Sequence, residues 1–273
     1  NGDLIIVAAR PGMGKTTLCL NFMSQVLKSG AGVVFFSLEM PAEQIMMRIL
    51  SSKTSIPLQD IMTGKIDYEA MARLSDACGE FSEYKLFVHD SGYVNIHQVR
   101  TQMRKLKAMH PEISLCVIDY IGLMMSTNNF ADRHIQIAEI SRGLKLLARE
   151  LDMPIIALSQ LNRSLESRAN KRPMLSDLRE SGAIEQDADI ILFVYRDEFY
   201  LEQEEKEKEK RASAEGKEYK STHVFNKLQE KAEIIVGKNR NGETGSVDVL
   251  FQKQHSRFED ITSAPVSDVT FEG

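Results

Sequence analysis

The segment "LIIVAARPGMGKTT", residues 4–17, constrains the fold more than any other part of the sequence. A continuous apolar run enters a loop with two glycines, and Lys15 and Thr16 then open an amphipathic stretch. A buried strand, a glycine loop and a helix in this order are typical of a loop that binds phosphate at the edge of a parallel sheet. The first glycine of the usual G-x-x-x-x-G-K-[ST] pattern is Ala9 here, which is a mild departure.

Each residue type in this loop has a chemical reason. Glycines let backbone N–H groups turn toward phosphate oxygens, and the helix N-terminus adds partial positive charge. The ammonium of Lys15 reaches the β- and γ-phosphates, and the hydroxyl of Thr16 can ligate Mg²⁺. We therefore predict that the loop binds a nucleotide rather than forming a plain tight turn. The predicted nucleotide-binding residues are Ala9, Arg10, Pro11, Gly12, Met13, Gly14, Lys15, Thr16 and Thr17.

Short apolar runs alternate with amphipathic patterns along most of the chain. The runs are continuous rather than alternating, which indicates strands of a mostly parallel sheet with helices on both faces. The pattern predicts one α/β domain over residues 1–260. Strands are expected at 4–9, 32–37, 85–90, 115–120, 154–160 and 189–196, and helices at 15–28, from Pro41, at 95–109 and within 135–151.

The segment "IIVGKNRNGETGSVDVLF", residues 234–251, predicts two added antiparallel strands around a polar turn. Asn-Gly pairs favour hairpins, and β-branched and apolar residues flank this pair. Lys238 and Arg240 lie just before the turn, and residues two apart on a strand project from the same face. Taken alone, these two cations are explained by the solubility of a charged hairpin tip.

A run of Glu and Lys with almost no apolar residue interrupts this pattern at residues 200–222. It is expected to be a solvated, partly helical insertion. We expect residues 261–273 to form a flexible tail. The chain enters its first strand within three residues and without a methionine, so an upstream N-terminal domain and linker are expected before it. Three pairs in the insertion have favourable i,i+4 spacing: Glu202/Lys206, Glu204/Lys208 and Glu207/Arg211.

Composition sets the general class of the protein. With 42% hydrophobic and 27% charged residues, the sequence is that of an ordinary globular domain. No apolar run approaches the roughly 18 residues that a membrane span needs. There is no signal peptide, and the three cysteines lack metal-like spacing, so we expect a cytoplasmic protein with reduced core thiols and no membrane partner. The net charge is −5, so nucleic-acid binding would require a local basic patch.

Polar side chains follow several of the predicted strands. In an open parallel sheet, ligands bind at the carboxyl ends of the strands. Asp119 follows "LCVI" and is placed to hold a magnesium shell, and Glu39 follows "VVFFSL" and can orient and deprotonate a water. Gln160 ends "IIALS" and can contact a γ-phosphate, whereas Asp90 after "LFVH" reads as a structural helix cap. These residues predict hydrolysis as well as binding, since phosphoryl transfer depends mainly on positioning and charge neutralisation.

Six motifs occur in order along the chain: "GDLIIVAARPGMGKTT", "FFSLEM", "VIDYIGLM", "ISRGLKLLARELDMPIIALSQLNR", "DLRESGAIEQDADI" and "EIIVGKNRNG". Together they resemble the C-terminal motor domain of the bacterial hexameric replicative DNA helicases of the DnaB type. The resemblance spans about residues 2–260, and "DLRESGAIEQDAD" and "KNRNG" are more diagnostic than the phosphate loop. It does not extend to the insertion, which is longer than the family usually carries. Gly122 stands where the family often has glutamine.

The resemblance implies a RecA-like P-loop ATPase fold and a homo-hexamer that uses ATP and Mg²⁺ to translocate on single-stranded DNA and unwind duplex. It implies a phosphate role for Lys15, magnesium roles for Thr16 and Asp119, a general-base role for Glu39 and a γ-phosphate contact for Gln160. Related helicases use the Lys-x-Arg pair as an arginine finger supplied by the next subunit, which implies that role for Arg240 with assistance from Lys238. A primase and a helicase loader are the implied protein partners.

A basic segment between Asn162 and Gly182 is the candidate DNA contact, and its plain alternative is a solvated loop. It follows Gln160 directly, so loss of the γ-phosphate can move it. Similar helicases line a central channel with this loop, through residues that match Arg179, Glu180 and Gly182. The segment has no aromatic residue to stack on bases, so contacts with the DNA backbone are expected, and these carry no sequence information.

Three other activities fit parts of the sequence. The first is a recombinase-type filament ATPase, against which "DLRESGAIEQDAD" and "KNRNG" argue. The second is a regulatory module that uses ATP to hold partners and has no DNA substrate. A simple kinase ranks last, because nothing resembles an acceptor site.

Overall fold

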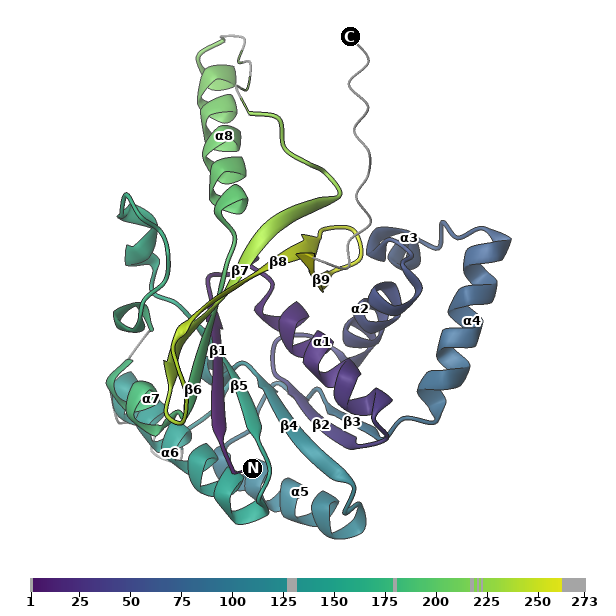
Figure 1. The fold of residues 1–273 in the computed structure, drawn as a ribbon, viewed down its shortest axis with the longest axis vertical. Helices are drawn as coiled ribbons and strands as arrows, with labels where there is room; N and C mark the ends of the chain where they lie inside the picture. The colour runs from purple at the N-terminus through teal and green to yellow at the C-terminus, as the bar shows by residue number, and fades with distance from the viewer. Residues whose placement is uncertain are drawn as a thin grey trace.

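The computed structural model describes residues 2–126, 132–178, 181–216, 219, 221 and 223–261. Within these ranges one sheet of nine strands has the order β3-β2-β4-β5-β1-β6-β7-β8-β9 (Figure 1). The strands are β1 Leu4–Ala9, β2 Gly32–Ser37, β3 Leu86–His89, β4 Ile113–Asp119, β5 Ile155–Gln160, β6 Ile190–Tyr195, β7 Gln229–Asn239, β8 Gly245–Gln252 and β9 Arg257–Asp260.

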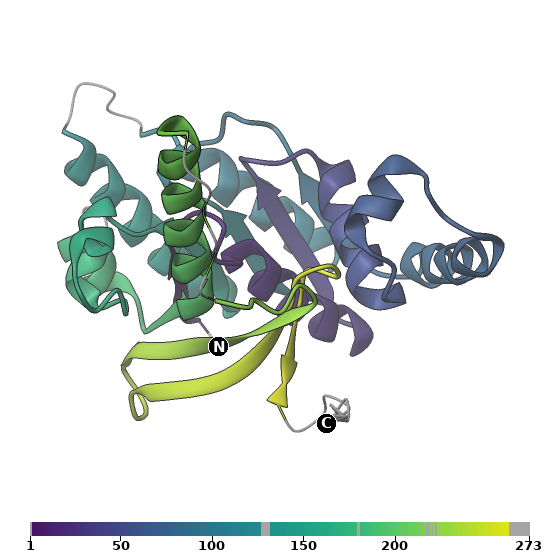
Figure 2. The same ribbon diagram turned by 90° about the horizontal axis from the view of Figure 1, so that it is seen from above.

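Helices flank the sheet on both faces. Helices α1 and α2 cover one face of the parallel strands, and α5 and α6 cover the other (Figures 1 and 2). The helices are α1 Lys15–Lys28, α2 Ala42–Thr54, α3 Leu58–Thr63, α4 Tyr68–Ser82, α5 Ile96–Met109, α6 Arg133–Leu151, α7 Ser181–Asp187 and α8 Asp197–Ala214, with short 3₁₀ turns η1 Ile121–Leu123, η2 Arg163–Ser167 and η3 Leu175–Asp177.

Six strands, β1 to β6, are parallel, and their register brings their carboxyl ends to one edge. Strand β1 lies between β5 and β6, with Ala9 opposite Gln160 and Ala8 opposite Phe193. Strands β7, β8 and β9 extend the sheet in antiparallel fashion beyond β6. The predicted α/β fold, with a mostly parallel sheet and a C-terminal hairpin, is confirmed.

The continuous apolar runs are explained by burial on both faces. Every residue of β2 is buried, and so are all but one residue of β1. The expected reduced core thiols are only partly confirmed, because Cys19 and Cys116 are buried whereas Cys78 is exposed. In the described part of the chain, every helix is too short or too polar to cross a membrane.

The sequence reading missed helices α3 and α4. The start of α4 carries a clear signal, because the side chain of Asp67 accepts a hydrogen bond from Ala70 N at 2.7 Å, as an N-cap does. Asp90 has the structural role expected of it, but it caps α2 by accepting from Ala42 N at 3.1 Å. Helix α5 is capped instead by Asn95.

The insertion forms helix α8, which projects away from the sheet (Figure 1). The helix begins at Asp197, three residues before the predicted start of the insertion at residue 200. Its first half is less solvated than predicted, since Tyr200 and Glu205 are buried. The buried carboxylate of Glu205 accepts hydrogen bonds from the hydroxyls of Tyr219 at 2.7 Å and Ser221 at 2.8 Å. Two of the expected i,i+4 pairs form, Glu202 with Lys206 at 4.0 Å and Glu207 with Arg211 at 3.9 Å. The third does not, because Glu204 pairs with Lys171.

Asp189, just before β6, joins three distant parts of the fold. Its Oδ2 accepts from Leu4 N at 2.8 Å and from Lys145 Nζ at 2.5 Å, and its Oδ1 lies 3.2 Å from an Arg240 nitrogen. Burial alone would raise the pKa of Asp189, but the hydrogen bonds from Lys145 and Leu4 outweigh it and lower this pKa. The ionised carboxylate therefore stabilises the fold at neutral pH.

Asp189→Asn is expected to lower the free energy of unfolding at pH 7 by about 3 kcal/mol, because the buried Lys145 loses its counter-charge. A carboxyl whose folded pKa is lowered contributes stability above its unfolded pKa, and that stability is lost as the pH falls through the folded pKa. The difference from wild type, measured by urea unfolding, should therefore shrink below about pH 4.

The matched control is Asp248→Asn, which removes an exposed pair with Lys231 at 2.8 Å. We expect a change below about 1 kcal/mol there. Equal effects of the two substitutions would contradict the role given to Asp189.

Candidate nucleotide-binding site

The loop between β1 and α1 has the backbone that a phosphate cradle needs. Gly12 has φ +81° and Gly14 has φ +99°, values that L side chains rarely adopt. The side chains of Ala9, Met13 and Thr17 are buried in the core. At these three positions the loop therefore offers a ligand its backbone rather than its side chains.

Three charged residues from different elements meet at the end of this loop. The Nζ atom of Lys15 lies 3.8 Å from Glu39 Oε2 and 3.9 Å from Asp119 Oδ1. Lys15 is 7% exposed, and its Nζ also lies 5.1 Å from the ring centroid of Tyr120. Asp119 is fully buried, whereas the Glu39 side chain is 49% exposed. The parallel strands thus bring together the cation and both carboxylates that the sequence analysis singled out.

The Asp119 carboxylate has the features of a cation ligand. Its Oδ2 accepts a hydrogen bond from the Thr16 hydroxyl at 2.7 Å, while its buried Oδ1 has no hydrogen-bond donor among the described residues. Burial raises the pKa of Asp119, and Lys15 and the Thr16 hydroxyl oppose that rise. A hydroxyl and a carboxylate oxygen side by side are the hard oxygen donors that Mg²⁺ prefers. The residues present therefore fit Mg²⁺.

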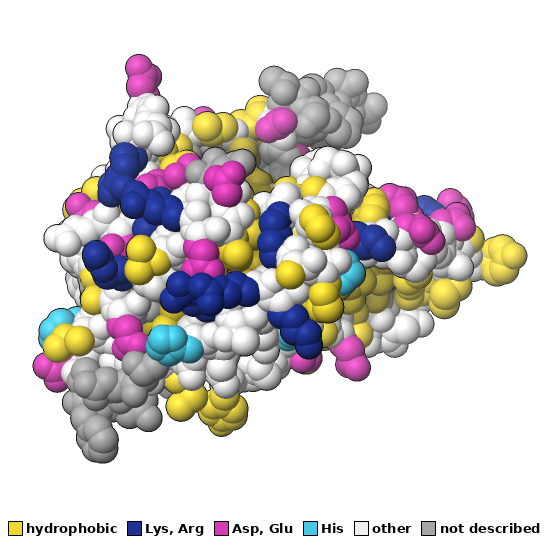
Figure 3. Space-filling view, turned by 90° about the horizontal axis from the view of Figure 1, so that it is seen from below, with side chains coloured by type: hydrophobic (Ala, Val, Ile, Leu, Met, Phe, Trp, Pro, Cys, Tyr) yellow, Lys and Arg dark blue, Asp and Glu magenta, His cyan; other side chains and the backbone are white. Residues whose placement is uncertain are grey.

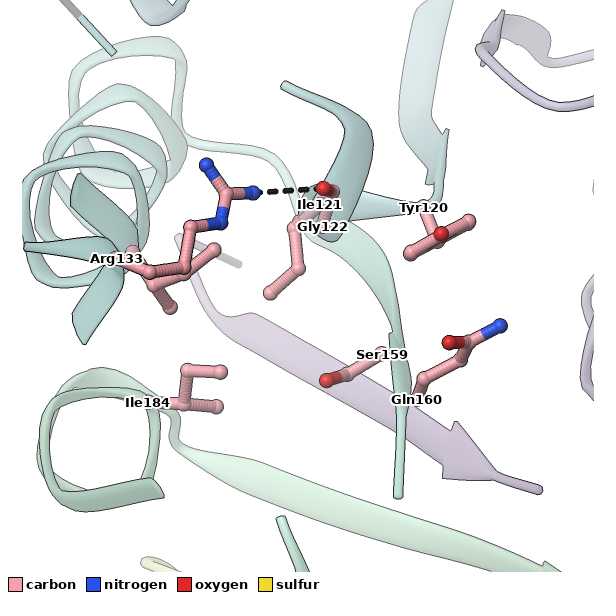
Figure 4. Close-up of a pocket in the computed structure, with 8 residues that line it drawn as sticks. Tyr120, Ile121, Gly122, Arg133, Ser159, Gln160 and Ile184 are labelled. Atoms are coloured by element: carbon pink, nitrogen blue, oxygen red, sulfur yellow. Dashed lines mark hydrogen bonds between the residues drawn. The ribbon is translucent and has the colours of Figure 1, made fainter. Parts of the chain in front are cut away.

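Gln160 lies next to this group at the end of β5, where it lines a cavity of about 170 Å³ (Figure 4). The cavity separates Gln160 from Ile184 on α7. On its far side Arg133 donates a hydrogen bond to Gly122 O at 2.6 Å. A Cβ atom on Gly122 would lie 2.6 Å from a Tyr120 ring carbon, so the present conformation has no room for a side chain there.

Arg10 points away from the phosphate loop. Its Nε donates to Glu166 at 2.7 Å, and its NH1 donates to Leu161 O at 2.9 Å. A second hollow of about 460 Å³ lies beside the loop and is lined by residues that include Arg10, Gln160 and Arg163. Arg10 thus ties the loop to the segment after Gln160.

Lys238 and Arg240 lie at the opposite edge of the parallel strands. Asn239 between them pairs with Ile190, which pairs with Ile5 near the start of β1, whereas the phosphate loop follows the end of β1. The two cations sit at the C-terminal end of α7, where the Nζ of Lys238 donates to Glu185 O at 2.5 Å and Ala188 O at 2.7 Å, and Arg240 donates to Gln186 O at 3.0 Å. Both project from the same side of the hairpin, as predicted.

Figure 3 shows the molecule from this amino-terminal edge of the parallel strands. Basic side chains there are interspersed with acidic ones on the described surface. Separately, Arg100 and Arg104 on α5 both pair with Glu150 on α6.

Three cations of the basic segment at 162–182 form ion pairs within the described part of the chain. Arg168 pairs with Asp177 at 2.7 Å, Arg172 pairs with Glu233 at 2.7 Å, and Lys171 pairs with Glu204. These pairs offset part of the positive charge that the sequence shows in this segment. Of the three candidate DNA-contacting residues, Arg179 and Glu180 lie outside the described residues, and Gly182 is exposed in the first turn of α7.

Sequence reasoning missed the residues that support the phosphate loop from behind. Arg196 follows β6 and donates a hydrogen bond to Gly12 O at 2.7 Å. A Cβ on Gly12 would meet Phe199 at 3.0 Å, and one on Gly14 would meet Phe258 at 3.0 Å. The available signal was the position of Arg196, a charged residue directly after an apolar strand.

Comparison with known proteins agrees with this geometry. The model of the DnaB-like helicase C-terminal domain family matches residues 1–260. The replicative DNA helicase DnaB of Helicobacter pylori strain 26695 is 48% identical over 95% of this chain and 56% of that protein, and that of Pasteurella multocida is 45% identical over 95% and 51%. The chain thus spans about half the length of these curated relatives.

Solved structures show the same fold. A DnaB-like replicative helicase, described with its interactions with primase, superposes with a TM-score of 0.82 at 35% identity. The superposition covers 95% of this chain and 57% of the helicase chain. A second solved structure, described as an ATPase domain, gives the same TM-score and identity over 95% of this chain and 84% of its own. The chain belongs to the DnaB-like helicase C-terminal domain family.

Proposed function

We propose that this chain is the ATP-driven motor of a replicative DNA helicase. It hydrolyses ATP at the interfaces of a homo-hexameric ring, translocates on single-stranded DNA and unwinds duplex at the replication fork. The observation that carries the proposal is the meeting of Lys15, Glu39 and Asp119 beside a phosphate loop in a DnaB-like domain. Replicative helicases from two bacteria share 45–48% of its residues over 95% of this chain, which favours helicase activity over a recombinase filament or an ATP switch.

Each polar residue of the site has a role in this proposal. The loop backbone and Lys15 bind the phosphates, since Lys15 is the first residue of α1 and its ammonium lies 3.8 Å from Glu39 Oε2. Thr16 and Asp119 would hold Mg²⁺, which supplies positive charge to the phosphate oxygens when bound. Gln160 at the end of the neighbouring strand contacts the γ-phosphate.

Glu39 is the proposed general base. Its carboxylate is half exposed, so a water can reach it, and it lies 3.8 Å from the ammonium that would hold the γ-phosphate. Asp119 is fully buried and bonded to Thr16, so it is suited to a cation and not to a mobile water. The two carboxylates thus differ in environment, and this difference assigns their roles.

The arginine finger is proposed to act between subunits. Lys238 and Arg240 lie at the far edge of the sheet from their own phosphate loop, so they do not serve it. The Arg240 side chain is 45% exposed, and Asp189 keeps Lys145 and Leu4 N as partners when Arg240 leaves. Arg240 is therefore free to enter a neighbour's site, with Lys238 assisting, and a ring places every site beside such a neighbour.

Arg179, Glu180 and Gly182 are the proposed DNA contacts, and Gly182 is exposed at the start of α7. The far end of α7 carries the contacts of Lys238 and Arg240. Helix α7 therefore links the proposed DNA loop with the proposed finger. A solved DnaB-like helicase is described with primase, which supports primase as a partner here, and a helicase loader is the second proposed protein partner.

Lys15→Ala is expected to abolish detectable ATP binding while the fold persists, because Lys15 supplies the positive charge that binds the phosphates in this proposal. Calorimetric titration with ATP and Mg²⁺ would measure binding, and circular dichroism would report the fold. The control Lys231→Ala removes an exposed lysine on β7 and should leave ATP binding unchanged. ATP binding by Lys15→Ala equal to that of wild type would exclude the assignment.

The proposal as a whole is tested by the steady-state ATPase rate of the whole protein with and without single-stranded DNA. We expect DNA to raise the rate.

Glu39→Gln should bind ATP and DNA normally but hydrolyse ATP at least about 100-fold more slowly, as expected for loss of a general base. A wild-type rate that DNA leaves unchanged would instead favour an ATP switch, and filaments in place of rings by electron microscopy would favour a recombinase.

A further inference from the structure

Arg196 is the first residue after β6 and lies at the same edge of the sheet as the phosphate loop. Strands β1 and β6 are parallel neighbours, with Ala8 opposite Phe193, so the chain leaves β6 directly beside the loop. Arg196 is only 5% exposed. Arginine is rarely buried to this extent unless its charge is paired, so its surroundings need an explanation.

Four elements meet around the Arg196 guanidinium. Its NH1 donates to Gly12 O at 2.7 Å, and its Nε pairs with Glu230 on β7, which is 3% exposed. The guanidinium carbon lies 4.1 Å from the ring centroid of Phe251 on β8 and 5.1 Å from that of Phe199 on α8. The two cation–π contacts and the directed hydrogen bonds together hold the group in one orientation.

The hydrogen bond to Gly12 O fixes the orientation of a peptide within the phosphate loop. The C=O and N–H of one peptide point in opposite directions, so the Met13 N–H faces away from Arg196. The Met13 N–H donates a hydrogen bond to Arg10 O at 3.3 Å, which closes the turn on its inner side. Gly12 adopts φ +81°, and Phe199 closes the outer side of the loop. Arg196 therefore holds the outer side of this peptide while Arg10 O holds its inner side, and together they fix the turn of the phosphate loop.

We propose that Arg196 is a positioning residue for the nucleotide, acting through the Gly12–Met13 peptide. The inference rests on the proposed function, in which this loop binds ATP. Arg196 holds the loop in its binding conformation before the nucleotide arrives, so the ordering of the loop does not reduce the binding free energy. Because helix α8 begins at the next residue, the same contacts attach the base of the insertion to the nucleotide site.

The same chemistry occurs at the other edge of the sheet and provides a matched control. Lys145 is a buried cation that pairs with a buried carboxylate, Asp189, at 2.5 Å and donates to a backbone carbonyl, Gly2 O, at 2.8 Å. It has no contact with the phosphate loop. Removing Lys145 therefore measures how much the loss of a buried cation destabilises the fold, separately from any effect on the phosphate loop.

The experiment compares Arg196→Met, Arg196→Lys and Lys145→Met in the whole protein. Binding of a non-hydrolysable ATP analogue with Mg²⁺ is measured by calorimetric titration, and thermal unfolding reports stability. In Arg196→Met, Glu230 keeps Lys253 at 3.3 Å as its counter-charge, which favours folding. We expect its Kd for the analogue to rise at least about tenfold, the effect of one charge-assisted hydrogen bond.

Arg196→Lys should raise the Kd at least about threefold, because an ammonium lacks the planar, forked geometry with which the guanidinium contacts Gly12 O, Glu230 and the aromatic rings. Lys145→Met should lower the melting temperature but change the Kd less than twofold. If Arg196→Met does not fold, Arg196→Lys decides the question.

Two results would overturn the inference: a Kd in the folded Arg196 variants within twofold of wild type, or an equal rise in Lys145→Met. Neither result concerns the proposed function itself. Failure of wild-type protein to bind the analogue would contradict that function instead.

Discussion

The parallel pairing of β1 with β5 and β6 is the constraint on which the rest of the structure depends. It places the phosphate loop in the middle of a sheet edge, with strands β4 and β2 beyond β5. Asp119 ends β4 and Gln160 ends β5, while Glu39 follows β2. The fully buried Asp119 is bonded to Thr16 and lies near Lys15, so the loop helix and the sheet are joined by the polar groups proposed to act on ATP.

The antiparallel extension gives the domain a second polar end. Strand β7 reverses direction beside β6, which carries Lys238 and Arg240 to the edge opposite the phosphate loop. There they contact the last turn of α7 and Asp189. A cation at that edge lies away from its own nucleotide site, and this separation is the physical reason for proposing that Arg240 acts in a neighbouring site. It also means that capture of Arg240 by a neighbour would remove contacts from α7.

The fold class and the convergence of polar strand ends could be predicted from the sequence because both follow from local patterns. Continuous apolar runs imply a buried parallel sheet, and parallel strands carry the residues after them to one edge. Helices α3 and α4 were missed although Asp67 gives α4 a standard N-cap. The hairpin was predicted from its Asn-Gly turn and flanking apolar residues, and it is present.

What the sequence did not reveal depends on contacts between residues far apart in the chain. The basic segment appeared rich in free charge, yet Arg172 pairs with Glu233 and Lys171 with Glu204, partners 61 and 33 positions away. The burial of Arg196 against Gly12 joins residues 184 positions apart. No periodicity or motif encodes such pairs, since they exist only after the strands have been assembled.

The central claim is that each nucleotide site is completed by the next subunit. Two inactive whole proteins, Glu39→Gln and Arg240→Ala, are mixed so that their subunits exchange, and the ATPase rate of the verified mixed rings is measured. If Arg240 acts across the interface, some sites combine an intact Glu39 with a neighbour's intact Arg240, and activity returns. If mixed rings stay inactive, Arg240 does not act in trans, and the two cations are a charged hairpin tip that caps α7.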